Sequence, residues 1–145
     1  MLKRLMNTTN DMSLTTLRVV LGVVFFAHGA QKMLGWFGGY GFQGTMGFFE
    51  HMGMPAPVAF LVICTEFFGG LGLIVGLLTR IAALGIGVEM IGAIFIVHLP
   101  NGFFMNWSGT QKGEGFEYHL LAIAMAATLL LRGAGAFSAD RAISK

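Results

Sequence analysis

The sequence predicts an all-α protein, a transmembrane four-helix bundle with a short amphipathic helix in an outer loop. Hydrophobic residues fill 55% of the 145 positions and charged residues only 11%, with a mean hydropathy of +0.74. A soluble domain of this size could not bury that much apolar surface. The apolar residues also gather in four stretches of about 20 residues, the length that spans a bilayer. Backbone groups in lipid must be paired within the chain, which favours helices.

The four stretches form one integral membrane domain that covers residues 1–145. Lys3 and Arg4 precede the first apolar run as in a signal peptide, but Arg18 interrupts that run, so we expect a retained helix. Only Thr79 and Arg80 separate the second stretch from the third, which predicts a tight antiparallel hairpin. The expected spans are approximately 14–34, 58–78, 81–99 and 116–131.

The basic residues orient the predicted bundle. Lysine and arginine accumulate in the cytoplasmic segments of membrane proteins. If both termini share one side, six basic residues lie on that side and two on the other, so we expect cytoplasmic termini. The six are Lys3, Arg4, Arg80, Arg132, Arg141 and Lys145, and the two are Lys112 and, near its boundary, Lys32.

The two outer loops differ in composition. The loop 35–57 is rich in glycine and aromatic residues, and its stretch Gln43–Met52 places Met46, Phe49 and Met52 at helical spacing. This spacing predicts a short amphipathic helix that lies against the bundle or the membrane interface. The loop 100–115 is polar. Three aromatic residues suit an outer interfacial belt: Trp36, Tyr40 and Trp107.

Composition excludes several classes of function. A net charge of +2 without a basic, aromatic-interleaved patch does not favour nucleic-acid binding. The single cysteine, Cys64, excludes an internal disulfide, a CxxC redox pair and covalent c-type haem attachment. A GxGxxG pattern spans Gly39–Gly44, but it falls in an outer loop without the strand that a dinucleotide site requires.

Ionisable residues inside the predicted spans are the main functional signal. A charge in the bilayer core is costly unless it faces a partner or a cavity. Counting along the helices at about 1.5 Å per residue puts Arg18 and Glu89 near one level. We therefore expect an Arg18–Glu89 ion pair, whose role is either functional or the fixing of helix register. The intramembrane set is Arg18, His28, Lys32, Glu66, Glu89 and His119.

Three of these residues are predicted to share a cavity in the outer half of the bundle. Glu66 falls near mid-membrane, with His28 and His119 within roughly one turn of it. Since these three lie on three different helices, they are the candidate catalytic residues. Lys32 and His98 lie nearer the outer boundary, where a lysine can also snorkel to the headgroups and a histidine is often solvated.

The first three spans carry an ordered set of motifs: Arg18-x3-Gly22-x5-His28-Gly29-x2-Lys32, Gly53-x-Pro55, Glu66-x3-Gly70-x5-Gly76-x2-Thr79-Arg80, Ala83 and His98. This ordered set resembles that of the DoxX family of small bacterial membrane proteins. The resemblance covers about residues 14–99. It implies a four-helix layout in the bacterial inner membrane, a link to membrane redox chemistry, and pattern positions at Arg18, His28, Lys32, Glu66 and His98.

Together these features predict a membrane subunit of a quinone-linked or thiol-linked oxidoreductase. His28 and Lys32 would donate hydrogen bonds to a quinone, Glu66 and His119 would exchange protons, and Arg18, Lys32 and His98 are the candidate cofactor-binding residues. No residue type in the chain carries electrons by itself, so a redox partner protein is required.

Two other functions remain open at this stage. In the first, His28 and His119 bind a metal ion or b-haem, although no HxxxH or HxH motif supports it. In the second, the polar residues serve a transporter or an assembly scaffold without catalysis. Homo-oligomerisation is compatible with either.

Overall fold

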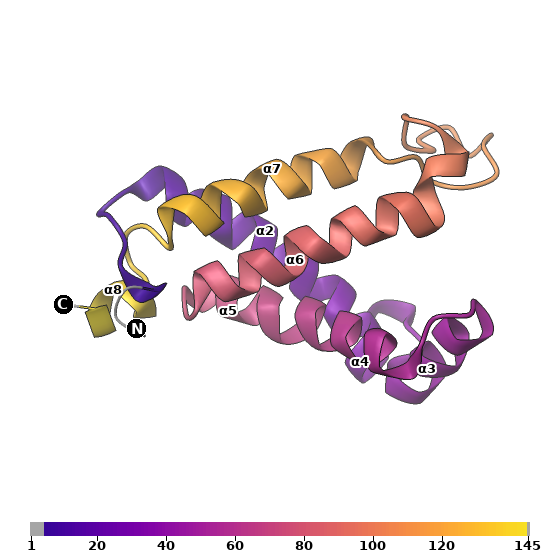
Figure 1. Cartoon of the computed structure of the whole chain (residues 1–145), viewed down its shortest axis with the longest axis horizontal. Helices are drawn as coiled ribbons and strands as arrows, with labels where there is room; N and C mark the ends of the chain where they lie inside the picture. Colours follow the sequence, from indigo (N-terminus) through magenta and orange to yellow (C-terminus); the bar gives the residue numbers. More distant parts are fainter. Residues whose placement is uncertain (1–4, 145) are drawn as a thin grey trace.

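The computed structural model describes residues 5–144, and within this range the chain forms helices and turns without any strand (Figure 1). The all-α fold class predicted from the sequence is confirmed. Lys3, Arg4 and Lys145, which contributed to the predicted orientation, lie outside the described residues.

Three helical segments are long and apolar enough to cross a membrane: Met12–Leu34, Ala56–Val75 and Thr79–Asn101, of 23, 20 and 23 residues. The first is α2. The second consists of α4 (Ala56–Cys64), a π-helical turn (Thr65–Gly69) and α5 (Gly70–Val75), and the third of α6 (Thr79–Ala93), a π-helical turn (Ile94–His98) and a 3₁₀ turn (Leu99–Asn101).

The fourth predicted span is α7, Glu117–Arg132, which lies along α6 (Figure 1). Its 16 residues are fewer than the about 20 that cross a bilayer unaided. The remaining helical elements are short and lie outside the four long segments: a 3₁₀ turn (Trp36–Gly38), α3 (Gly41–His51) and α8 (Ala139–Ser144).

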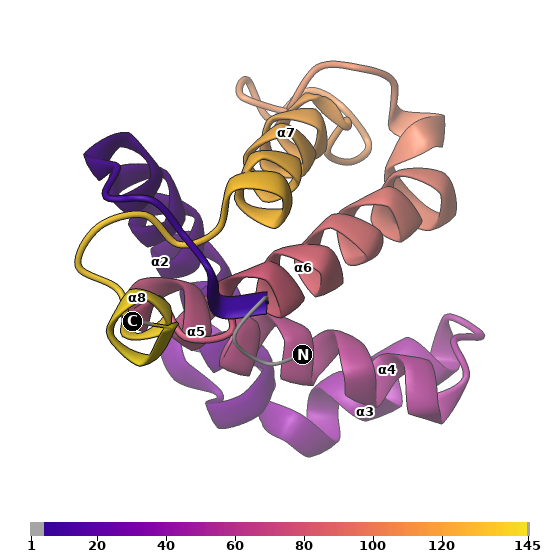
Figure 2. The same ribbon diagram turned by 60° about the vertical axis from the view of Figure 1, so that its left-hand side comes forward.

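The elements divide the bundle into two ends. Both termini, α8 and the turn between α5 and α6 lie at one end, which we call the termini end (Figures 1 and 2). Helix α3 and the loop 102–116 lie at the opposite end, the loop end. Both views show α3 and the loop 102–116 well separated from each other, so the bundle spreads apart toward the loop end.

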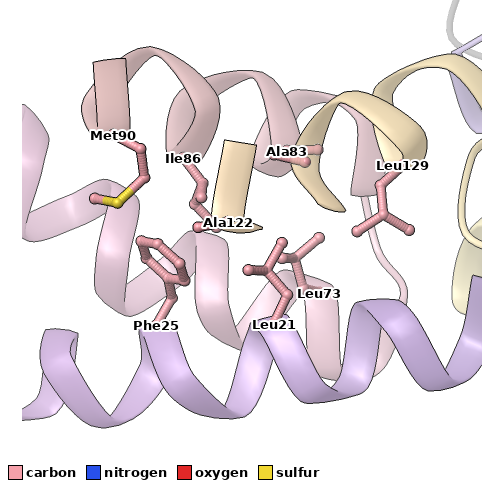
Figure 3. Close-up of a cluster of buried hydrophobic side chains, with 9 residues drawn as sticks. Leu21, Phe25, Leu73, Ala83, Ile86, Met90, Ala122 and Leu129 are labelled. Atoms are coloured by element: carbon pink, nitrogen blue, oxygen red, sulfur yellow. The ribbon is translucent and has the colours of Figure 1, made fainter. Parts of the chain in front are cut away.

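The core lies between the four long helical segments, each of which contributes apolar side chains to it (Figure 3). Phe25 and Ile86 are 1% and 0% exposed, whereas Leu121 and Phe95 on the outside are 67% and 69% exposed. Large exposed apolar side chains on every outer face are expected for helices that contact lipid tails. The core cluster is Leu21, Phe25, Leu73, Ala83, Ile86, Met90, Ala122, Ala126 and Leu129.

Glycines allow α2 to approach the second helical segment closely. A Cβ on Gly29 would lie 2.3 Å from the backbone nitrogen of Phe67, and one on Gly22 would lie 2.8 Å from the carbonyl oxygen of Gly70. Such small residues let helix backbones approach each other in membranes. This contact fixes which face of α2 meets the second segment, and therefore which side chains can reach it.

The hairpin between the second and third segments turns earlier than predicted. The turn comprises Gly76–Leu78, and Thr79 already begins α6. Gly76 adopts the left-handed conformation (φ +73°) that commonly ends a helix at glycine. Arg80 belongs to α6, and its guanidinium donates to the Leu130 and Leu131 carbonyl oxygens of α7.

The predicted outer-loop helix is confirmed as α3. Its inward side carries Thr45, which is 4% exposed, and half-buried Met46 and Phe49 at helical spacing. Met52, which we expected on the same face, lies beyond the end of the helix and is 46% exposed.

Candidate intramembrane site

An ion pair between α2 and the second helical segment forms the centre of the candidate site. Lys32 Nζ lies 2.6 Å from Glu66 Oε2, and the two side chains are 23% and 8% exposed. The snorkelling alternative for Lys32 is therefore wrong in this structure, because its ammonium turns inward to a buried carboxylate. A buried charge pair of this kind is tolerated in an apolar surrounding since each charge compensates the other.

Glu66 lies in the π-helical turn Thr65–Gly69 that interrupts the second segment. A π-turn inserts a residue into the α-helical ladder, and such turns are frequent at functional sites. His98 ends the second π-turn of the chain's described part, Ile94–His98. Both sequence-predicted polar residues thus lie where the helical backbone departs from α geometry.

Glu89 of α6 completes the cluster. Its side chain lies within hydrogen-bonding reach of Glu66 and within electrostatic range of Lys32. Glu89 Oε2 is buried and has no hydrogen-bond partner among residues 5–144. Tyr118 of α7 lies within electrostatic range of both carboxyl groups. The cluster Lys32–Glu66–Glu89 therefore draws on three helical segments.

Lys32 also lines a pocket that lies beneath α3. The pocket has a volume of about 260 Å³ and combines this ammonium with aromatic side chains. Tyr40 and Phe48 are stacked there with ring centroids 6.4 Å apart. Lys32 thus connects the pocket to the buried carboxylates. The complete lining is Gln31, Lys32, Gly38, Gly39, Tyr40, Thr45, Phe48 and Phe49.

Two histidines meet between the third segment and α7. The ring centroids of His98 and His119 are 4.0 Å apart, and His98 Nδ1 donates to the Glu114 carbonyl oxygen at 2.8 Å. His119 is 5% exposed, and its Nδ1 has no hydrogen-bond partner in the described part of the chain. The inward orientation predicted for His119 is confirmed. Glu117 instead accepts hydrogen bonds from the backbone of Met105 and the indole of Trp107.

The expectation that His28 joins Glu66 and His119 is wrong in this structure, because His28 is exposed. The reason lies in the packing face of α2. Gly29 abuts the backbone of Phe67, and at about 100° per residue His28 lies a quarter-turn away from Gly29. Lys32 is closer in phase to that contact, and its longer side chain reaches Glu66.

The predicted Arg18–Glu89 ion pair is also wrong. Arg18 is 2% exposed, and its guanidinium donates all five of its N–H groups to backbone carbonyl oxygens. Depth counting ignored the segment after α7, which folds back over the start of α2 and supplies three of these acceptors. Arg18 is occupied at the termini end, away from the pocket. Its acceptors are Leu73, Ile74, Ala134, Ala136 and Phe137.

Asp140, in α8, was missed by sequence reasoning. Its two carboxylate oxygens accept from the backbone nitrogens of Leu78 and Thr79, at 2.7 and 2.9 Å. It is 1% exposed and caps the start of α6. An aspartate near the end of a basic tail gives no sequence signal that it will cap a helix distant in the chain.

The histidine arrangement does not favour the metal or haem alternative. Within residues 5–144 there is no group of three or more His, Cys, Asp or Glu side chains placed to hold a metal ion. His28 is exposed on α2 while His119 contacts His98, so the two proposed axial ligands belong to different environments. The residues present suit hydrogen-bond donation and proton exchange.

The chain matches the sequence profile of the DoxX family over residues 13–99. No solved structure matches the chain significantly. The matched region contains both partners of the Lys32–Glu66 pair, Glu89 and His98, but ends before His119.

Three curated proteins are similar to the chain over most of its length. CatD of Bacillus subtilis (strain 168), named as a proposed oxidoreductase, is 34% identical over 80% of this chain and 77% of its own. The membrane protein Rv3486 of Mycobacterium tuberculosis is 31% identical over 98% of this chain and 88% of its own. The inner membrane protein YqjF of Escherichia coli (strain K12) is 29% identical over 97% and 98%.

Proposed function

The chain belongs to the DoxX family of membrane proteins, and on that premise we propose that it is the membrane subunit of a quinone-linked oxidoreductase. The single observation that carries this proposal is the position of Lys32. Its side chain lines the pocket beneath α3 and also pairs with buried Glu66. A hydrogen-bond donor is thereby connected to a group that can exchange protons, as quinone reduction requires.

The pocket supports a ring-sized ligand with a polar edge. Its volume of about 260 Å³ is slightly below the roughly 300–1,000 Å³ of typical small-molecule sites. It therefore suits a quinone head group whose apolar tail remains in the lipid. Lys32 would donate to one ring carbonyl, and the rings of Tyr40 and Phe48 would pack against the head group.

The chemistry divides between this chain and a partner. Reduction of a quinone to a quinol consumes two electrons and two protons. The electrons would come from a redox centre on a partner protein, in keeping with the oxidoreductase name given to CatD. This chain would bind the head group, orient it through Lys32 and transfer protons through its buried carboxyl groups.

We further propose that the protein lies in the bacterial inner membrane with its termini end in the cytoplasm. The inner membrane location is supported by the name of YqjF. Arg80, Arg132 and Arg141 all lie at the termini end, consistent with the positive-inside rule. The pocket beneath α3 would then open toward the outer side.

The experiment is to purify the protein in mild detergent, extract the bound lipid and assay it for quinone. Wild-type protein should retain quinone, K32M should lose it, and K112M should keep it, because Lys112 is exposed in the loop 102–116. Titration with a short-chain ubiquinone, followed by tryptophan fluorescence, gives an affinity for each protein. Equal quinone content and affinity in wild type and K32M would overturn the proposal.

A further inference from the structure

The three ionisable groups of the cluster do not balance in charge when all are ionised. Lys32 supplies one positive charge, whereas Glu66 and Glu89 would supply two negative ones. The cluster lies between apolar helices, where an uncompensated charge is expensive. One proton on either carboxyl group restores neutrality.

The geometry identifies the carboxyl group that is ionised. Glu66 is the one in direct contact with the ammonium, at 2.6 Å, and its side chain is 8% exposed. A charge-assisted contact this short is expected between an ammonium and a carboxylate. Glu66 therefore acts as the counter-ion of Lys32.

Glu89 is in a different position. The Oε2 atoms of both glutamates are buried without a hydrogen bond among residues 5–144, but only that of Glu66 contacts the Lys32 ammonium. The Glu89 side chain lies within hydrogen-bonding reach of Glu66. Two carboxyl groups can share a hydrogen bond only when one of them carries a proton, because a carboxylate has no donor. The other groups that face Glu89 are Lys32 and, from α7, Tyr118.

We propose that Glu89 carries a proton in the resting protein and is the internal proton donor of the Lys32–Glu66 site. The protonation of Glu89 does not depend on the proposed function. Only the transfer of its proton toward a bound quinone rests on that function. When the ligand takes up two electrons from the partner, one N–H bond of Lys32 breaks and an O–H bond forms on the ligand. The O–H bond of Glu89 then breaks, and its proton passes through Glu66 to restore the Lys32 ammonium. The second proton comes from water at the loop end.

The first test is infrared spectroscopy of the quinone-free protein in detergent. A protonated carboxylic acid has a carbonyl stretch separate from that of a carboxylate, and it shifts in D2O. The wild-type protein should show this band, and E89Q should lack it. E50Q is the matched control, because Glu50 is exposed on α3 and its substitution should leave the band unchanged. Absence of the band from wild type, or its retention in E89Q, would overturn the proposal.

The second test compares thermal unfolding midpoints in the same detergent. E89Q replaces a neutral acid with a neutral amide and should leave the midpoint nearly unchanged. E66Q removes the counter-ion of a buried ammonium and should lower the midpoint by about 10 °C. The double variant K32M/E66Q should recover much of that loss. An E89Q midpoint as low as that of E66Q would mean that Glu89 is ionised, and would overturn the proposal.

These outcomes are separate from those of the quinone assay. Both readouts use protein without quinone, so a failure to bind quinone leaves them interpretable. Loss of quinone binding in K32M together with no protonated acid would retain the proposed function and reject the proton donor. If Glu89 is protonated but the protein binds no quinone, Glu89 remains a possible proton donor, and proton transfer from it to a quinone is rejected.

Discussion

The two ends of the bundle both bury charged side chains, but these side chains pair with different groups. At the termini end, Arg18 uses all five donors and Asp140 uses both oxygens in hydrogen bonds to backbone. Farther from the termini end, Lys32 and Glu66 pair with each other, and Glu89 Oε2 and His119 Nδ1 are buried without partners in the described chain. Two atoms near the termini end, Thr79 Oγ1 and Arg80 Nε, are also buried without a partner among residues 5–144. Buried polar atoms are nearly always satisfied, and exceptions need an explanation. We attribute the hydrogen bonds of Arg18 and Asp140 to a structural role, and the arrangement of Lys32, Glu66 and Glu89 to proton exchange.

The backbone shows the same contrast. The termini end joins α5 to α6 through a tight turn at Gly76, where an added Cβ would lie 2.9 Å from Cζ of Arg18. On the loop-end side, the second and third segments contain π-helical turns at Thr65–Gly69 and Ile94–His98. The tight turn packs against the fully hydrogen-bonded guanidinium of Arg18. The π-turns instead carry Glu66, which contacts Lys32, and His98, which contacts His119.

Substituting Arg18 should produce the largest effect on stability. R18M removes a donor from five backbone carbonyl oxygens, of which only that of Ala136 keeps another hydrogen bond within residues 5–144, from Thr15 Oγ1. It should lower the free energy of unfolding by about 3–5 kcal/mol. R18K should also be strongly destabilised, since an ammonium cannot reproduce the planar five-donor fork. The measurement is thermal unfolding in detergent with the yield of monodisperse protein. R132M, which alters an exposed arginine, is the control, and equal midpoints for R18M and R132M would refute the structural role.

Widening the contact between α2 and the second segment should have the next largest effect. G29V places a branched side chain where a Cβ alone would lie 2.3 Å from the Phe67 nitrogen. Overpacking should cost about 1–3 kcal/mol, and it should also separate Lys32 from Glu66 and weaken quinone binding. G92A is the matched control, because a Cβ on Gly92 meets no atom within 4 Å. A G29V protein with wild-type stability would show that the close approach is not required.

Removing the Asp140 cap should have a smaller effect that is confined to the termini end. D140A leaves the backbone nitrogens of Leu78 and Thr79 without acceptors and should cost about 1–2 kcal/mol. Quinone binding should not change, because the pocket lies at the other end. D11A, which removes the more exposed cap at Ser13 of α2, should cost less. A loss of quinone binding in D140A would mean that the two ends are coupled.

Substituting His28 should have the smallest effect of these four changes. It tests whether the ligand pocket extends from Lys32 to His28. H28L alters an exposed side chain and should change the free energy of unfolding by less than about 0.5 kcal/mol. Its quinone content should equal that of wild type, in contrast to K32M. If H28L lost quinone as K32M does, the pocket would extend to His28 and the original three-residue cavity would be restored as the better hypothesis.

Local patterns were sufficient to predict the helical elements. The apolar stretches indicated all four long helices to within about three residues, and the spacing of Met46 and Phe49 indicated α3. Hydrophobic length and periodicity are properties of the local sequence, since a bilayer imposes them on each helix separately. The inward position of His119 agrees with its predicted depth on one helix in the same way.

The pairing of the charged groups depends on contacts between helices, and there local patterns failed. Counting residues placed Arg18 and Glu89 near one level, yet the returning segment after α7 supplies three of the five acceptors of Arg18. His28 and Lys32 are separated by only about 40° in phase, yet the contact of Gly29 with Phe67 leaves one exposed and brings the other to Glu66. The identity of each partner is set by the rotation and approach of packed helices, and chain segments more than 30 residues apart contribute to both outcomes.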